Sequence, residues 1–168
     1  MNKSITSDTE KQLKTILSKR IMMMDGAMGT MIQQHHLTEE DYRGKQFSTF
    51  ASPDGQRELF LKGNNELLSI TQPDIIQQIH ESYLEAGSDI IETNTFGASP
   101  LRLKEFDFTQ IDTADIKSIP SSLDLTKSDY SAITHHLNVE GCRVARKAID
   151  RYKTEADYDG RPLFVAGS

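Results

Sequence analysis

The sequence has no tryptophan, a single cysteine (Cys142) and no long apolar segment. One cysteine excludes an internal disulfide framework, and it excludes a multi-cysteine zinc site supplied by this chain alone. No apolar run approaches the roughly 18 residues that a membrane helix needs. Residues 1–6 also lack the apolar centre of a signal peptide. We therefore expect a cytoplasmic protein that does not bind membranes.

Basic side chains are in the minority. The chain has 19 Lys and Arg against 25 Asp and Glu, which gives a formal net charge of -6. Without a basic block, nucleic acid is not expected as a partner, because that binding depends on neutralising phosphates. The 168 residues, 36% of them hydrophobic, are enough for one domain with a core. A small polar ligand is the expected partner.

Short apolar runs alternate with amphipathic segments. The runs at 21–24, 90–91 and 163–166 are typical of strands buried on both faces. Helical spacing predicts a helix from Pro73 to the stop at Gly87. A later helix is predicted to bury Leu137, Gly141, Val144, Ala145, Ala148 and Tyr152. This alternation predicts an α/β fold with a parallel sheet. The last run ends at Gly167-Ser168, so that strand is expected to leave an open sheet edge.

Two polar stretches interrupt this pattern. Residues 33–61 have turn residues and scattered aromatics, which indicate a partly ordered surface excursion. Residues 104–134 are polar and acidic with few periodicities, which indicates a polar insertion.

Polar residues follow the first two predicted strands. Ligands of parallel α/β folds bind beyond the carboxyl ends of strands. Asp25 suits an ammonium group, and the backbone amides of Gly26 and Ala27 suit a carboxylate, which together form an amino-acid recognition pattern. Alternatively, this Asp-Gly pair is only a turn. Glu92, at the end of a buried strand and followed by Thr93 and Asn94, needs a partner or a ligand.

Other chemically reactive side chains have simpler interpretations. The methionines within 22–31 are expected to fill the core. The pairs His35-His36 and His135-His136 lack a third ligand at metal spacing, so we expect solvated surface positions for them and for His80. Cys142 is expected to be a packing residue.

Four segments, in register, resemble the cobalamin-dependent methionine synthase family. These are residues 21–32 (IMMMDGAMGTMI), 41–44 (DYRG), 62–68 (KGNNELL) and 85–97 (EAGSDIIETNTFG). The resemblance spans most of residues 9–103 and resumes over about 138–167.

The resemblance implies the homocysteine-binding (β/α)8 barrel of a multidomain methyltransferase. In that family zinc holds homocysteine as a thiolate, and the sulfur takes a methyl group from methylcobalamin, which methyltetrahydrofolate recharges. Asp25 would hold the substrate ammonium, and Gly26 and Ala27 would offer amides to its carboxylate. Glu92, Thr93 and Asn94 would line the rim nearby.

The sequence also departs from this family. The three cysteines that hold its zinc are missing, so neither a zinc site nor a cobalamin site is expected in this chain. Three strands are about three-eighths of the barrel. We therefore expect residues 1–168 to be an amino-terminal fragment of the barrel that is inactive alone. The rest of the barrel and the folate- and cobalamin-binding modules would be its partners.

Two other functions remain open. One is a small α/β module that binds an amino acid without catalysis. The other is a related homocysteine methyltransferase that uses betaine or a sulfonium donor in place of cobalamin.

Overall fold

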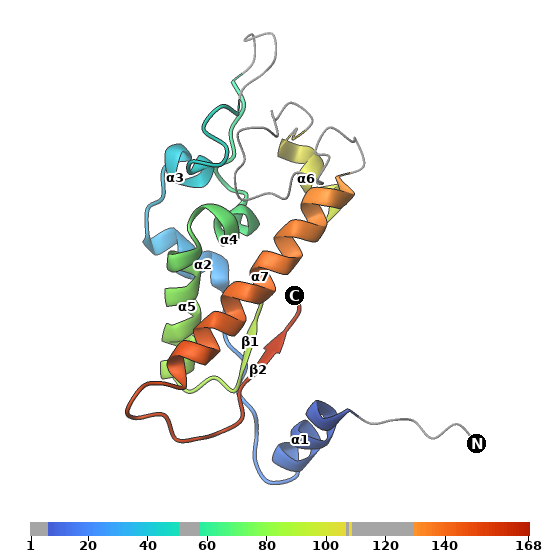
Figure 1. The fold of residues 1–168 in the computed structure, drawn as a ribbon, viewed down its shortest axis with the longest axis vertical. Coiled ribbons are helices and arrows are strands. Elements are labelled where there is room, and N and C mark those ends of the chain that lie inside the picture. Colours follow the sequence, from blue (N-terminus) through green and yellow to red (C-terminus); the bar gives the residue numbers. More distant parts are fainter. Residues whose placement is uncertain (1–6, 51–57, 107, 109–129) are drawn as a thin grey trace, which may run out of the picture.

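A computed structural model describes residues 7–50, 58–106, 108 and 130–168 (Figure 1). The first half contains α1 (Asp8–Leu17), α2 (Met28–Gln34), α3 (Glu39–Arg43), η1 (Asn65–Leu67), α4 (Leu68–Thr71) and α5 (Pro73–Glu85). The second half contains β1 (Ile90–Glu92), α6 (Pro100–Leu103), η2 (Lys104–Phe106), α7 (Ser131–Tyr152) and β2 (Phe164–Ala166). No helix within these ranges has the length and apolar character needed to cross a bilayer.

The sheet is parallel, as the alternation of elements predicts. β1 pairs with β2, with Ile91 opposite Val165. On the other side of β1, Met24 forms a parallel bridge with Ile90. The segment that ends at Met24, β1 and β2 therefore lie in chain order, and their carboxyl ends meet at one edge. α5 and α7 pack on each other beside this sheet (Figure 1).

The prediction of a strand buried on both faces at 21–24 is wrong. The structure has only the bridge at Met24, and the side chains of Ile21, Met23 and Met24 are 82%, 58% and 50% exposed. Main-chain bonds tie this segment to β1, but burial on both faces needs other segments packed over those faces, and the described residues do not cover these side chains.

The segment 33–61, predicted as a partly ordered surface excursion, is mostly exposed or half-buried where the structure describes it, but some of its side chains reach the core. Phe47, Phe50 and Leu61 are fully buried, and the Phe47 and Phe50 rings pack on Phe108 at centroid distances of 6.1 and 5.9 Å. Aromatic burial therefore outweighs the polar composition of the segment. Residues 51–57, 107 and 109–129, and with them most of the predicted insertion at 104–134, lie outside the described residues.

The predicted face of the later helix is confirmed. α7 buries Leu137, Gly141, Val144, Ala145, Ala148 and Tyr152. α5 ends as predicted before Gly87, whose positive φ of 103° suits glycine.

Three minor predictions about single side chains are wrong. His80 is completely buried, because on α5 it lies one turn from the buried Ile76 and one turn from the buried Leu84. His136 on α7 is also buried, whereas its neighbour His135 is exposed. Cys142 does not pack in the core, because it follows the buried Gly141 on α7 and its side chain turns to solvent.

Candidate functional site

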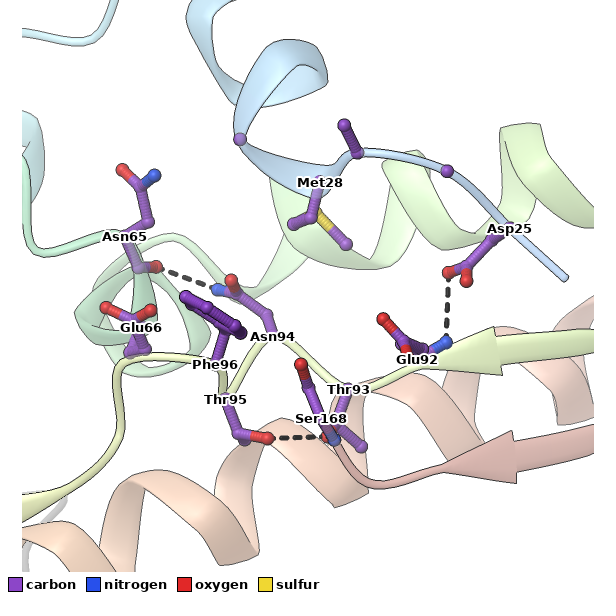
Figure 2. A pocket seen from close by; sticks show the side chains of 13 residues that line it. Asp25, Met28, Asn65, Glu66, Glu92, Thr93, Asn94, Thr95, Phe96 and Ser168 are labelled. Carbon is purple, nitrogen blue, oxygen red and sulfur yellow. Dashed lines mark hydrogen bonds between the residues drawn. The ribbon is translucent and has the colours of Figure 1, made fainter.

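A pocket of about 400 Å³ lies at the carboxyl edge of the sheet (Figure 2). It is lined by Asp25, Gly26, Ala27, Met28, Gly29, Asn65, Glu66, Glu92, Thr93, Asn94, Thr95, Phe96 and Ser168. All six residues that the sequence singles out are therefore brought together around one space. They come from the loop that follows Met24, from the last residue of β1 and from the loop that follows β1.

Asp25 is held in place by its main chain and by one side-chain oxygen. Its N–H donates to the Ile90 carbonyl at 2.9 Å, and its Oδ2 accepts the Glu92 N–H at 3.0 Å (Figure 2). Oδ1 is buried and accepts a hydrogen bond from no described residue. Burial raises the pKa of Asp25 to about 6. The carboxylate thus has an unused acceptor, which a ligand donor would satisfy.

Gly26 and Ala27 form the adjoining wall. A Cβ on Gly26 would lie 3.2 Å from the Tyr83 hydroxyl, which itself donates to the Ala27 carbonyl at 3.4 Å. Within the described residues, the N–H groups of Gly26 and Ala27 have no acceptor. Two backbone donors are therefore left for a ligand, close to the Asp25 carboxylate.

The loop after β1 forms the opposite wall. The Thr93 N–H donates to the Ala166 carbonyl at 2.9 Å, and its hydroxyl lies 2.7 Å from that of Thr95. Asn94 Nδ2 donates to the Asn65 carbonyl at 2.7 Å (Figure 2). The side chain of Glu92 is half-buried and lines the pocket, so this carboxylate lies where a ligand group can reach it.

Seven of the thirteen lining residues are not among the six that the sequence singles out, and three of the seven are Asn65, Glu66 and Phe96. Asn65 and Glu66 belong to η1, and Glu66 Oε1 accepts the Gly97 N–H at 2.8 Å. Phe96 lies at the pocket with 90% of its surface exposed. The motif at 62–68 was the sequence signal that could have pointed to Asn65 and Glu66. Nothing local in this motif shows that η1 packs against the loop after β1.

The charge of the pocket has one sign. Three carboxylates line it, those of Asp25, Glu66 and Glu92, and its lining includes no lysine, arginine or histidine. Such a site favours a ligand with a cationic group, such as an ammonium.

Comparison with known proteins decides the family. Residues 22–168 match the family model for homocysteine S-methyltransferases. This chain belongs to that family. The resemblance seen in the sequence is confirmed at this level.

The structure is also similar to that of a homocysteine S-methyltransferase family member. It matches the crystal structure of the homocysteine methyltransferase MmuM from Escherichia coli, in its metallated form, with a TM-score of 0.55 and 20% sequence identity. The match covers 93% of this chain and 40% of that chain. At this identity the likeness establishes a shared fold, and our chain spans well under half of the length of MmuM.

The zinc that the resemblance implies has no matching set of ligands among the described residues of our chain. Among them, no three His, Cys, Asp or Glu side chains come together as a metal site. Cys142 is exposed on α7 and does not line the pocket. We therefore derive no chemical step through a metal from these residues.

Proposed function

We propose that this chain forms the amino-acid-binding part of a homocysteine S-methyltransferase. The observation that carries the proposal is Oδ1 of Asp25, which is buried and has no partner among the described residues, next to the N–H groups of Gly26 and Ala27, which have no acceptor there either. The carboxylate would accept the ammonium of homocysteine, and the two amides would donate to its carboxylate. Glu92, Thr93 and Asn94 would complete the rim.

In this proposal the described residues bind and orient, and they do not activate sulfur. Methyl transfer forms a bond between sulfur and the methyl carbon while the bond between that carbon and the methyl donor breaks, and it requires that the thiol lose its proton. Holding both ends of the amino-acid group fixes the direction of the thiol side chain, which lowers the entropy cost of the reaction. We propose that the group that removes the thiol proton is supplied from outside the described residues.

We further propose that the complete enzyme is a cobalamin-dependent methionine synthase, in which this chain is the first part of a (β/α)8 barrel. The parallel arrangement of Met24, β1 and β2 supports the barrel. The motifs at 21–32, 62–68 and 85–97 support the synthase, and they contain twelve of the thirteen residues that line the pocket. Zinc, folate- and cobalamin-binding modules and the rest of the barrel would be its partners.

The methyl donor can be tested with the purified gene product. With homocysteine and methylcobalamin, we expect a complete enzyme to form methionine, whereas residues 1–168 alone form none. Methionine formed from betaine or from S-methylmethionine, and not from methylcobalamin, would contradict the synthase assignment. That outcome would not contradict the proposed homocysteine site.

Replacing Asp25 by asparagine is expected to weaken homocysteine binding by about 1–3 kcal/mol, because a charged hydrogen bond is lost. Isothermal titration calorimetry with L-homocysteine measures this. The analogue 4-mercaptobutanoate, which lacks the ammonium, should bind wild type and D25N equally. Asp8→Asn, at an exposed position on α1, is the control variant. Equal affinity of D25N and wild type for homocysteine would refute the ammonium assignment.

Homocysteine binding is also expected to depend on pH. Because the pKa of Asp25 is raised to about 6, a fraction of this carboxyl is protonated at pH 5 and cannot pair with an ammonium. Affinity should therefore rise between pH 5 and pH 7 and then level off, with release of a proton on binding. Calorimetry in buffers of different ionisation enthalpy measures that proton. A flat profile for wild type, equal to that of D25N, would contradict this role of Asp25.

A further inference from the structure

The side-chain amide of Asn94 is fixed from two sides. Nδ2 donates to the Asn65 carbonyl at 2.7 Å (Figure 2). It also donates to the Ser69 hydroxyl at 3.2 Å. A backbone carbonyl only accepts, so the nitrogen of Asn94 must face Asn65. Both protons of Nδ2 are then used. The hydrogen bonds of this side chain with described residues both run through Nδ2, so Oδ1 is left as the free polar atom of a side chain that lines the pocket.

Asn65 is itself held by a residue outside the pocket. The hydroxyl of Tyr42, on α3, donates to Asn65 Oδ1 at 2.8 Å. Tyr42 is only 5% exposed, and burial raises the pKa of its hydroxyl, so the group stays protonated as a donor. Tyr42 therefore holds the side chain of Asn65, and the main-chain carbonyl of the same residue holds Asn94.

Hydrogen bonds hold α3, which carries Tyr42, to the segment around residues 59–62. The Glu39 carboxylate accepts the N–H groups of Leu61 and Lys62 at 2.9 and 2.7 Å. Glu39 also pairs with Arg43 at 2.8 Å, and Arg43 donates to the Leu59 carbonyl at 2.7 Å. These bonds hold α3 to the segment that leads into η1. Tyr42 and Asn65 are thus anchored by the same part of the fold.

We propose that Tyr42 and Asn65 are positioning residues of the ligand site, which turn Asn94 Oδ1 toward the ligand as an acceptor. This rests on the proposed function for the identity of the ligand. The N–H groups of homocysteine are those of its ammonium, so Asn94 Oδ1 would share the recognition of this group with Asp25. The sequence offers no local sign of this role, because Tyr42 lies in a polar stretch far from the strand ends.

Tyr42→Phe tests the proposal by removing one hydroxyl. We expect the dissociation constant for homocysteine to rise about 3- to 10-fold, as for the loss of one neutral hydrogen bond. Tyr158→Phe is the matched control, because its hydroxyl also donates to a carbonyl oxygen, here the backbone carbonyl of Arg161, and it lies away from the pocket. Tyr158→Phe should leave the affinity unchanged even if it lowers stability as much.

A double-mutant cycle separates positioning from general destabilisation. If Tyr42 acts through Asn94, adding Tyr42→Phe to Asn94→Ala should cause no further loss of affinity. Additive losses would overturn the proposal.

A readout that needs no ligand is the NMR signal of the Asn94 side-chain amide. Tyr42→Phe should shift this signal and speed its hydrogen exchange, and Tyr158→Phe should do neither. An unchanged signal in Tyr42→Phe overturns the positioning role. A wild-type chain that fails to bind homocysteine contradicts the proposed function instead, so the two failures are distinguishable.

Discussion

Replacing Asp89 by alanine is expected to lower the free energy of unfolding by about 3 kcal/mol, because a buried carboxylate and several of its charged hydrogen bonds are lost. Asp89 accepts two bonds from the Arg20 guanidinium, both at 2.7 Å, and the Met23 N–H at 2.9 Å. Its side chain is 2% exposed. The carboxylate therefore joins the segment before Met24 to the start of β1.

Urea unfolding followed by circular dichroism measures this loss. Asp8→Ala is the control, because Asp8 makes an exposed ion pair with Lys11 and should matter little. The hydrogen bond from Arg20 lowers the pKa of Asp89. Its contribution should be complete above the unfolded pKa of about 3.9 and be lost as pH falls through the folded value. An unchanged unfolding midpoint for D89A would show that this carboxylate does not hold the first segment to β1.

Acidification is expected to lower the free energy of unfolding of the wild-type chain by about 3 kcal/mol through His80, and replacing His80 by leucine should remove this loss. His80 is completely buried, and neither of its ring nitrogens has a hydrogen-bond partner among the described residues. Burial lowers its pKa to about 4. Below the unfolded pKa of about 6.5, the unfolded state therefore binds a proton that the folded state excludes. The wild-type chain should lose stability as pH falls from about 6.5 to 4 for this reason.

The difference in stability between the wild-type chain and H80L isolates the effect of His80. Asp25 acts in the opposite direction. Because its pKa is raised to about 6, it makes the folded state more stable as pH falls from about 6 toward its unfolded pKa. It is present in both proteins and cancels. Urea midpoints at several pH values should show the stability advantage of H80L growing as pH falls below 6.5. His135→Leu, at an exposed position on the same protein, should show no such growth. Parallel curves for H80L and wild type would contradict the burial of a neutral imidazole.

The buried histidine also shows where sequence patterns lose information. Ile76, His80 and Leu84 are spaced four apart on α5, so their common face was readable. Polarity argued for solvent at His80, and packing between α5 and α7 outweighed it. The prediction for Cys142 was wrong in the opposite sense: it was expected to pack and is exposed. It follows the buried Gly141 on α7, and a step of one residue along a helix turns the side chain away from the core.

Long-range contacts account for the other errors. The apolar run at 21–24 has the composition of a buried strand, yet burial depends on what covers it, and the described residues leave most of its side chains exposed. Phe47 and Phe50 lie in a polar stretch, and their burial depends on Phe108, far along the chain. Composition averaged over a segment carries no record of such partners.

Local patterns were sufficient for the helical face of α7, the end of α5 at Gly87, the parallel order of the strands and the family. They also singled out Asp25, Gly26, Ala27, Glu92, Thr93 and Asn94 as candidates, because periodicity places strand ends and ligand-facing loops follow those ends. The tertiary structure alone brought these residues around one pocket and left Asp25 Oδ1 without a partner among the described residues. It also placed η1 and Tyr42 behind Asn94. Burial and hydrogen-bond pairing depend on segments distant in sequence, which no local pattern encodes.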